Sequence, residues 1–308
     1  MDDVKKIADD ELFSFVEFNA AESEKTGSSD YSYWGSVLKT FLKNKVAVIL
    51  LIVMVSLITF SFFAVATAKF PYDQLNRENM LLVPNGTYWF GTDTLGRDMW
   101  ARTWYGTTIS MRLAGIVTII DVLVGVSIGC IWGYVKQTDR FFTELYNIIF
   151  NIPQMIYLML LTYILSAGFW TLVLALCSTG WLGMSRNVRN LVFMIRDREY
   201  NLASRCLGTP LYRMVIKNLL PYLVSVVILR LALMIPAVIS LEVTLSFLGL
   251  GLPGTMPSLG QLLSQGRSKF VDFPHLLVYP TLIVSIITIS FYLIGNAFSD
   301  ASDPRNHV

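Results

Sequence analysis

The chain has 308 residues and a formal net charge of +2, and 54% of its residues are hydrophobic whereas only 15% are charged. A soluble domain carries about 25% charged residues to cover its surface, so this composition, with a mean hydropathy of +0.55, argues against a soluble enzyme and against a nucleic-acid-binding protein. The three cysteines, Cys130, Cys177 and Cys206, are widely spaced, which indicates neither a disulfide framework nor a zinc site.

Six apolar segments predict membrane-spanning helices, because a helix needs about 20 apolar residues to cross a bilayer. In chain order they are residues 46–68, 109–135, 145–165, 169–184, 222–248 and 276–298. The first segment is longer than the apolar core of a signal peptide, which has about 7 to 15 residues, so we expect an uncleaved anchor. The sequence thus predicts an all-α integral membrane protein with six transmembrane helices.

Lysine and arginine residues predict the orientation of these helices, since they are enriched in cytosolic loops. With the N-terminus in the cytosol, the cytosolic segments hold 16 lysines and arginines and the outer segments hold 6. Both termini are therefore expected to be cytosolic. The first 30 residues are acidic, and two interpretations stay open for them: a solvated tail, or a short partner-binding helix at the apolar residues 12–16.

The most basic stretch is residues 186–220, which we expect to form a cytosolic loop between the fourth and fifth spans. One short helix is predicted over residues 199–207 and ends at Gly208, a residue that tolerates the left-handed backbone of a helix C-terminus. A second helix is predicted to begin with Thr209 as its N-cap and Pro210 in its first turn, and a further proline opens the fifth span. A loop that only carried positive charge would not need these signals, so docking of a partner is favoured.

This loop resembles the EAA loop of ABC-importer permeases. The run from Glu199 to Gly208 fits the first part of that pattern, and Leu220 and Pro221 close it at the matching positions. Three residues depart from the pattern, namely Leu202, Ser204 and Asn218.

Two further stretches resemble signatures of one branch of these permeases, the branch for peptides and nickel. Residues 91–98 read GTDTLGRD, and residues 242–251 read EVTLSFLGLG. Together with the loop, they identify the chain as similar to the C-type subunit of oligopeptide permeases in the bacterial cell membrane.

The resemblance implies the transmembrane-domain fold of type I ABC importers and an assembly of several chains. The implied partners are a homologous B-type permease subunit forming a heterodimer, two cytosolic ABC ATPases, an extracellular substrate-binding lipoprotein and membrane lipid. The sequence has no G-x-x-x-x-G-K-[ST] phosphate-binding loop, so ATP and Mg are expected on the ATPases. We expect this chain to be non-catalytic and to bind neither cofactor nor metal. Oligopeptides are the implied substrate, and the alternatives are dipeptides, glutathione or nickel, or a stand-alone secondary transporter.

On this basis we divide the chain into four parts. Residues 1–35 form an acidic cytosolic tail, residues 36–104 the first transmembrane helix and outer loop, residues 105–302 the permease core with a coupling loop at 186–221, and residues 303–308 a cytosolic tail. The residues expected to couple the chain to the ATPases are Glu199, Leu202, Ala203, Ser204, Arg205, Gly208, Thr209, Pro210, Leu220 and Pro221.

Four charged residues lie within the predicted spans, where a charge is costly. They are Arg112, Asp121, Arg230 and Glu242. Their depths suggest two buried pairs, Asp121 with Arg230 and Arg112 with Glu242. The alternative is that Arg230 or Asp121 faces the translocation pathway and meets a peptide terminus.

The outer-loop signature contributes the candidate residues Asp93, Gly96, Arg97 and Asp98. Glycine permits tight turns and aspartate caps helices, so a purely structural role and a docking site for the binding protein both stay open.

Glycine and proline residues predict local features of the second, third and fifth helices. Gly125, Gly129 and Gly133 are spaced four residues apart in the second span, which favours close packing against another helix. Pro153 and Pro236 predict kinks in the third and fifth spans.

Overall fold

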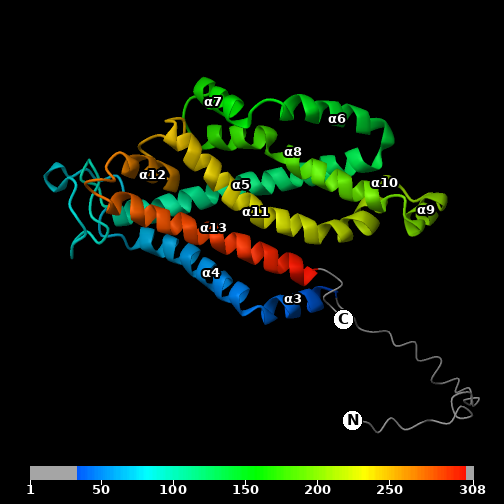
Figure 1. Ribbon diagram of the computed structural model, residues 1–308, viewed down its shortest axis with the longest axis horizontal. Helices are drawn as coiled ribbons and strands as arrows, with labels where there is room; N and C mark the ends of the chain where they lie inside the picture. The colour runs from blue at the N-terminus through cyan, green and yellow to red at the C-terminus, as the bar shows by residue number, and fades with distance from the viewer. Residues whose placement is uncertain (1–32, 303–308) are drawn as a thin grey trace, which may run out of the picture.

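The computed structural model describes residues 33–302, and this part of the chain is helical with no β-strand (Figure 1). The elements are α3 (Tyr33–Lys43), α4 (Lys45–Ala66), the 3-10 helix η1 (Arg77–Asn79), α5 (Met99–Tyr134), α6 (Lys136–Phe150), α7 (Gln154–Ile164), α8 (Phe169–Ile195), α9 (Glu199–Cys206), α10 (Leu211–Arg213), the π-helix η2 (Met214–Leu219), α11 (Leu220–Phe247), α12 (Leu259–Arg267) and α13 (His275–Ser302). The expected helix at residues 12–16 and the tail at 303–308 lie outside the described residues.

Helix α5 lies at the centre of the bundle, with α8, α11 and α4 packed around it (Figure 1). The main core forms where α5 meets α8, α11 and α13. Its innermost side chains are at most 1% exposed and include Leu113, Val117, Leu172, Ile239 and Ile287. Because lipid tails are as apolar as these side chains, such a core holds helices together by close packing more than by exclusion of water.

The glycines of α5 form its tight contact with α8. A Cβ atom at Gly125 or Gly129 would lie 2.6 Å from an atom of α8, and one at Gly133 would lie 2.7 Å away. Side chains essentially never approach so closely, so only glycine permits this separation of the two helices. The prediction that the small-residue spacing packs α5 against another helix is confirmed.

Four helices are long and apolar enough to cross a membrane: α4, α5, α13 and residues 222–247 of α11. The bent pair α6 and α7 raises the number to five if it counts as one span. The expected span at 109–135 belongs to α5, which begins ten residues earlier, and the one at 169–184 belongs to α8, which continues to Ile195. The membrane character of the chain is thus confirmed, whereas the count of six spans stays a prediction.

The predicted kink at Pro153 in the expected third span, residues 145–165, is confirmed, and it is a complete break of the helix. The chain breaks between Phe150 and Gln154, and α6 and α7 meet at an angle of 79°. Pro153 lies in the break, and proline lacks the N–H that would continue a helical hydrogen-bond ladder. Helix α7 has 11 residues, or about 16 Å at 1.5 Å per residue, which is too short to cross a bilayer by itself. By contrast, α11 continues through Pro236.

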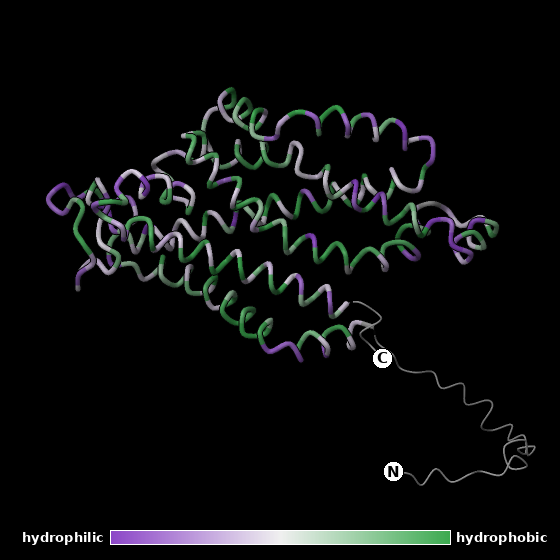
Figure 2. Tube along the Cα trace, in the orientation of Figure 1, coloured by the Kyte–Doolittle hydropathy of each residue, from purple (hydrophilic) through white to green (hydrophobic). Residues whose placement is uncertain are grey.

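The polar segments of the bundle lie at its two ends. Helix α9 lies at one end, and α12 lies at the other together with the loop of residues 67–98 (Figure 1). We call these the α9 end and the α12 end. The start of α3 and the end of α13 both lie toward the α9 end, while α4 between the ends is hydrophobic along most of its length (Figure 2). This distribution of polar and apolar segments is typical of a membrane protein.

Candidate functional site: the α9 loop and the charged residues of the bundle

Helix α9 forms where the sequence predicts the first helix of the loop. It begins at Glu199 and ends at Cys206, and Gly208 follows with a φ of 74°, in the left-handed region that favours glycine. Its buried anchor is Asn201, whose Nδ2 donates to the carbonyl oxygen of Ile195 at 2.8 Å. A short helix with only eight residues gains little stability from its own hydrogen bonds, so such anchors hold it in place.

A second anchor of α9 is Arg205, which joins it to the ends of α8 and α5. Its Nη2 donates to the carbonyl oxygen of Arg196 at 2.7 Å and to Asp197 Oδ1 at 3.2 Å, and its guanidinium lies 5.0 Å from the ring centroid of Tyr134. Arg196 is buried and donates to the carbonyl oxygen of Gly133 at 2.7 Å. Burial alone would raise the pKa of Asp197, but the hydrogen bonds and charges of the two arginines lower it below its usual value.

The link from α9 to α11 uses two of the three residues that depart from the EAA pattern. Asn218 Nδ2 donates to Asn201 Oδ1 at 3.0 Å and to Ser204 Oγ at 3.3 Å. Asn218 and Ser204, which both depart from the pattern, thus contact each other directly. The contribution of Asn201 was missed, because a buried asparagine in a polar loop gives no signal in the sequence.

The second predicted helix of the loop differs from expectation. Helix α10 begins at Leu211 and runs through the π-helix η2 directly into α11, without a break before Pro221. A π-helix has i→i+5 hydrogen bonds, and here it ends at Leu219, two residues before Pro221, which cannot donate a backbone N–H. The second helix of the loop and the fifth span, predicted as separate elements, are therefore continuous in the structure. The carbonyl oxygen of Pro210 accepts from the N–H groups of Arg213 and Met214, while the capping role of Thr209 stays a prediction.

Helix α9 exposes apolar side chains on the surface away from the bundle. Leu202 is 43% exposed, and Leu207, just after the helix, is 86% exposed. Most of the other expected coupling residues also lie at the surface: Glu199, Ala203, Gly208 and Pro210 are exposed, and Ser204, Arg205 and Thr209 are half-buried. The structure therefore presents two exposed leucines and several polar groups on a small, firmly anchored projection.

The signature residues of the loop at the α12 end form a buried network around Asp93. Its Oδ1 accepts from the N–H groups of Leu95 and Arg97 at 2.8 and 2.9 Å, and its Oδ2 accepts from Arg97 Nε at 2.7 Å. Arg102, which is fully buried, approaches the same carboxylate at 3.4 Å. These contacts favour the structural interpretation of the signature, with Thr94 and Leu95 as its exposed residues.

Gly96 and Asp98 shape the same loop. Gly96 has a φ of 74°, and a Cβ there would overlap the carbonyl oxygen of Asn76. Asp98 is the N-cap of α5, since its carboxylate accepts from the N–H groups of Trp100 and Ala101. Burial raises the pKa of Asp98, and these two N–H donors oppose the rise. Both residues are thus explained by the local fold.

The expected pair of Arg112 with Glu242 is wrong. Glu242 is 0% exposed, and its carboxylate accepts four hydrogen bonds, from Ser258 Oγ at 2.6 Å, Ser246 Oγ at 3.0 Å, the N–H of Gly260 at 3.2 Å and Ser110 Oγ at 3.4 Å. A buried carboxylate with four donors is satisfied without a cation. Glu242 instead joins α11 to α5 and to the start of α12.

Arg112 lies on the surface of the bundle, with its guanidinium 5.5 Å from the ring centroid of Phe62.

The expected pair of Asp121 with Arg230 is also wrong. Asp121 is buried against Gly180 of α8, and its Oδ1 has no hydrogen-bond partner within residues 33–302. Arg230 is exposed and donates from Nη2 to Asn187 Oδ1 at 3.2 Å. The depth of a residue along a helix does not tell on which side of the helix its side chain points.

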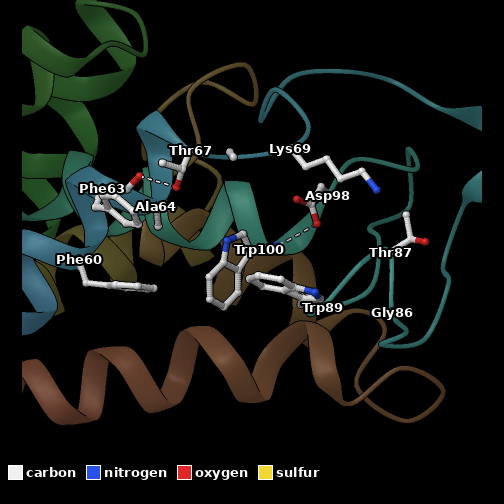
Figure 3. Close-up of a pocket in the computed structure, with 11 residues that line it drawn as sticks. Phe60, Phe63, Ala64, Thr67, Lys69, Gly86, Thr87, Trp89, Asp98 and Trp100 are labelled. Atoms are coloured by element: carbon white, nitrogen blue, oxygen red, sulfur yellow. Dashed lines mark hydrogen bonds between the residues drawn. The ribbon is translucent and has the colours of Figure 1, made fainter.

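A cleft of about 370 Å³ lies at the α12 end between α4, the loop of residues 67–98 and the start of α5 (Figure 3). Aromatic rings form much of its wall. Trp100 contacts Trp89 and Phe60 edge to face, with ring centroids 4.8 and 6.0 Å apart, and Lys69 and Asp98 lie on the polar side. Such aromatic groups are typical of the level where a membrane meets water. No local sequence pattern indicates this cleft, because its wall comes from three separate segments.

Comparison with known proteins gives the family. Residues 125–308 match the model of the "Binding-protein-dependent transport system inner membrane component" family, and residues 32–84 match that of the "N-terminal TM domain of oligopeptide transport permease C". The chain belongs to the family of binding-protein-dependent transport system inner membrane components, and it is a multi-pass permease subunit of an ABC importer in a bacterial membrane. The resemblance to C-type permeases seen in the sequence is confirmed.

Three similar proteins are permeases of peptide transport systems. The oligopeptide transport system permease protein AmiD of Streptococcus pneumoniae is 40% identical over 97% of this chain and 98% of its own length. OppC of Bacillus subtilis, an oligopeptide permease, is 32% identical over 96% and 97%, and DppC of the same organism, a dipeptide permease, is 31% identical over 96% and 93%. A more distant likeness, with a TM-score of 0.49 and 18% identity over 65% of this chain and 97% of the other, is to a chain of the MetNI methionine ABC transporter.

Proposed function

We propose that this chain is the subunit of an ATP-driven importer that forms part of the path for oligopeptides into the cell. Two of the three relatives described above are named as oligopeptide permeases, and the first is similar over nearly the whole of both chains. The observation that carries the proposal is the anchored projection of α9 with its exposed Leu202 and Leu207. Dipeptides are the second candidate substrate, favoured by the similarity to DppC.

In this proposal α9 is the coupling helix that receives movement from partner ATPases. Its exposed leucines would enter an apolar groove on an ATPase, and Asn201 and Arg205 would pass the displacement on to α11, α8 and α5. A helix that is fixed by hydrogen bonds to the end of α8 and to Asn218 before α11, and by a cation–π contact to Tyr134 of α5, moves with these helices as one body. This suits a shear or hinge transition between two packed arrangements. ATP and Mg would bind only to the ATPases, and this chain would contribute no catalytic group.

The proposed topology has six spans with both termini in the cytosol. The pair α6 and α7 would form one broken span, and α8 another, in addition to the four long apolar helices. The arginines around α9 favour the cytosolic side for that end, and the α12 end would then face the outside. There, the exposed Thr94 and Leu95 would be available to an extracellular binding lipoprotein, and a homologous B-type permease would complete the membrane part.

Reconstitution of the complete transporter tests this function. The chain would be purified with its partner permease, two ATPases and binding protein, and uptake of labelled peptides into proteoliposomes would be followed with and without ATP. We expect ATP-dependent uptake of oligopeptides. Uptake by this chain without the ATPases would contradict the proposal and favour a stand-alone secondary transporter.

Charged substitutions test the role of α9 in that system. Leu202→Asp and Leu207→Asp place a charge on the surface that would be buried against the ATPase, so we expect at least a tenfold weaker association, equivalent to about 1.4 kcal/mol or more. Leu75→Asp is the matched control, because Leu75 is 61% exposed in the loop at the opposite end. Equal co-purification of the ATPases with all three variants would show that α9 is not the docking element.

A further inference from the structure

One face of α11 carries a charge and small or hydroxyl-bearing side chains among half-buried apolar ones. Arg230, Ala237 and Ser240 are exposed and Thr244 is half-buried, and these residues lie one or two helical turns apart on the same side of the helix. By contrast, the exposed side chains of α4 are mostly large and apolar. A face with a charge, a small side chain and two hydroxyl groups is suited to contact with water or with a polar ligand.

Arg230 is held on this face by a residue of α8. Its Nη2 donates to Asn187 Oδ1 at 3.2 Å, and Asn187 Nδ2 in turn donates to the carbonyl oxygen of Gly183 at 2.8 Å. The second hydrogen bond fixes the orientation of the amide, so its oxygen points toward the arginine. None of the ion pairs formed within residues 33–302 includes Arg230.

Arg230 lies well inside a membrane-spanning stretch, where an arginine is expected to pair with an anion. The residue lies in the stretch 222–247, which is apolar enough to cross a membrane, and it is about 15 Å from the start of α11 at 1.5 Å per residue. A guanidinium at such a depth is costly against lipid and normally faces a bundle interior or a water-filled cavity, where it pairs with an anion. Arg112, another exposed arginine in a long helix, lies instead over the ring of Phe62.

We propose that Arg230, positioned by Asn187, binds a carboxylate of the peptide as it passes through the membrane. This inference rests on the proposed function. Only one N–H of the guanidinium is used by Asn187, so the other donors can take both oxygens of a carboxylate in the two-pronged geometry that arginine favours. The carboxylate comes either from the C-terminus of the peptide or from an acidic side chain, and suitable peptides separate the two sources.

The test compares Arg230→Gln with the wild-type chain in the complete transporter in proteoliposomes. Three peptides of equal length serve as probes: one with a free C-terminus and no acidic residue, its C-terminally amidated form, and an amidated form with one glutamate. The ratio of variant to wild-type uptake is taken for each peptide, so that preferences of the binding protein cancel. We expect uptake of carboxylate-containing peptides to fall about tenfold or more, as for loss of a hydrogen bond to a charged group, while the neutral amidated peptide is unaffected.

The pattern across the peptides and variants decides the outcome. A loss restricted to the free C-terminus assigns the site to the peptide terminus, and a loss that includes the glutamate peptide assigns it to carboxylates in general. Arg230→Lys keeps the positive charge but loses the two-pronged geometry of the guanidinium, so an intermediate loss of uptake is expected. Arg112→Gln removes one positive charge, as Arg230→Gln does, and should leave the uptake ratio at one for all three peptides. An equal loss for all three peptides, or no loss, would overturn the inference. Absence of ATP-dependent uptake by the wild-type transporter would overturn the proposed function itself, and this inference with it.

Discussion

Asn218 and Asn201 join the two sides of the α9 loop through a hydrogen bond of 3.0 Å between their side-chain amides. Asn201 is fully buried and belongs to α9, whereas Asn218 belongs to the π-helix that continues into α11. The bond therefore connects the exposed projection directly to a long helix of the bundle. It gives α9 a mechanical link that does not depend on the backbone between them.

Replacement of Asn218 by leucine should weaken this link. The change leaves the buried Asn201 Oδ1 without its donor, which costs about 1 to 3 kcal/mol, so α9 would move more independently of α11. We expect the number of peptides transported per ATP hydrolysed to fall severalfold, while the ATPases still associate. Lys217→Ala is the neighbouring control, since Lys217 is exposed. A transport ratio that is the same for both variants would argue against the mechanical role.

Replacement of Glu242 by leucine should destabilise the α12 end of the bundle. Three serine hydroxyls and the N–H of Gly260 would lose their common acceptor inside the protein. We expect a loss of about 2 to 4 kcal/mol, seen as a lower thermal unfolding temperature of the purified complex. Ser246→Ala removes only one of the donors and should lower that temperature less. If both variants unfolded at the same temperature, the network would not have the importance that its geometry indicates.

Replacement of Gly129 by alanine should separate α5 from α8. The new Cβ would lie 2.6 Å from the carbonyl oxygen of Ser185, and overpacking of this kind costs about 1 to 3 kcal/mol. Gly115→Ala is the matched control in the same helix, because a Cβ there has no atom within 4 Å and alanine favours the helix. Thermal unfolding of the two variants in detergent checks the prediction, and a Gly129→Ala variant as stable as Gly115→Ala would contradict it.

Much of the helical framework could be predicted from the sequence because apolar length and helix-ending signals act locally. The apolar run from residue 46 gave α4 within a few residues, and Gly208 marked the end of α9. The small-residue spacing of α5 was equally informative, since it needs only a neighbouring helix. The break between α6 and α7 was harder to foresee, because a proline shows that a helix is disturbed but not by how large an angle.

The partners of the charged residues within the predicted spans could not be predicted from the sequence. Asp121, Arg230 and Glu242 were singled out as charged residues within the predicted spans, but their pairing was inferred from depth alone. Glu242 is satisfied by Ser110 and Ser258, which lie far from it in the sequence and come close only when α5, α11 and α12 are packed. Rotation of each helix about its own axis depends on the whole bundle, so no local pattern could supply these partners.

The hydrogen bonds of Glu242 also constrain how the α12 end can open. Ser258 and Gly260 lie at the start of α12, and both donate to the carboxylate on α11. A second bond from the N–H of Leu259 to Ser110 Oγ joins the same turn to α5 at 3.1 Å. Helix α12 is therefore not a free flap that swings on a hinge. Any widening at this end requires α5 and α11 themselves to part, so the size of the opening is set by the tilt of two long helices.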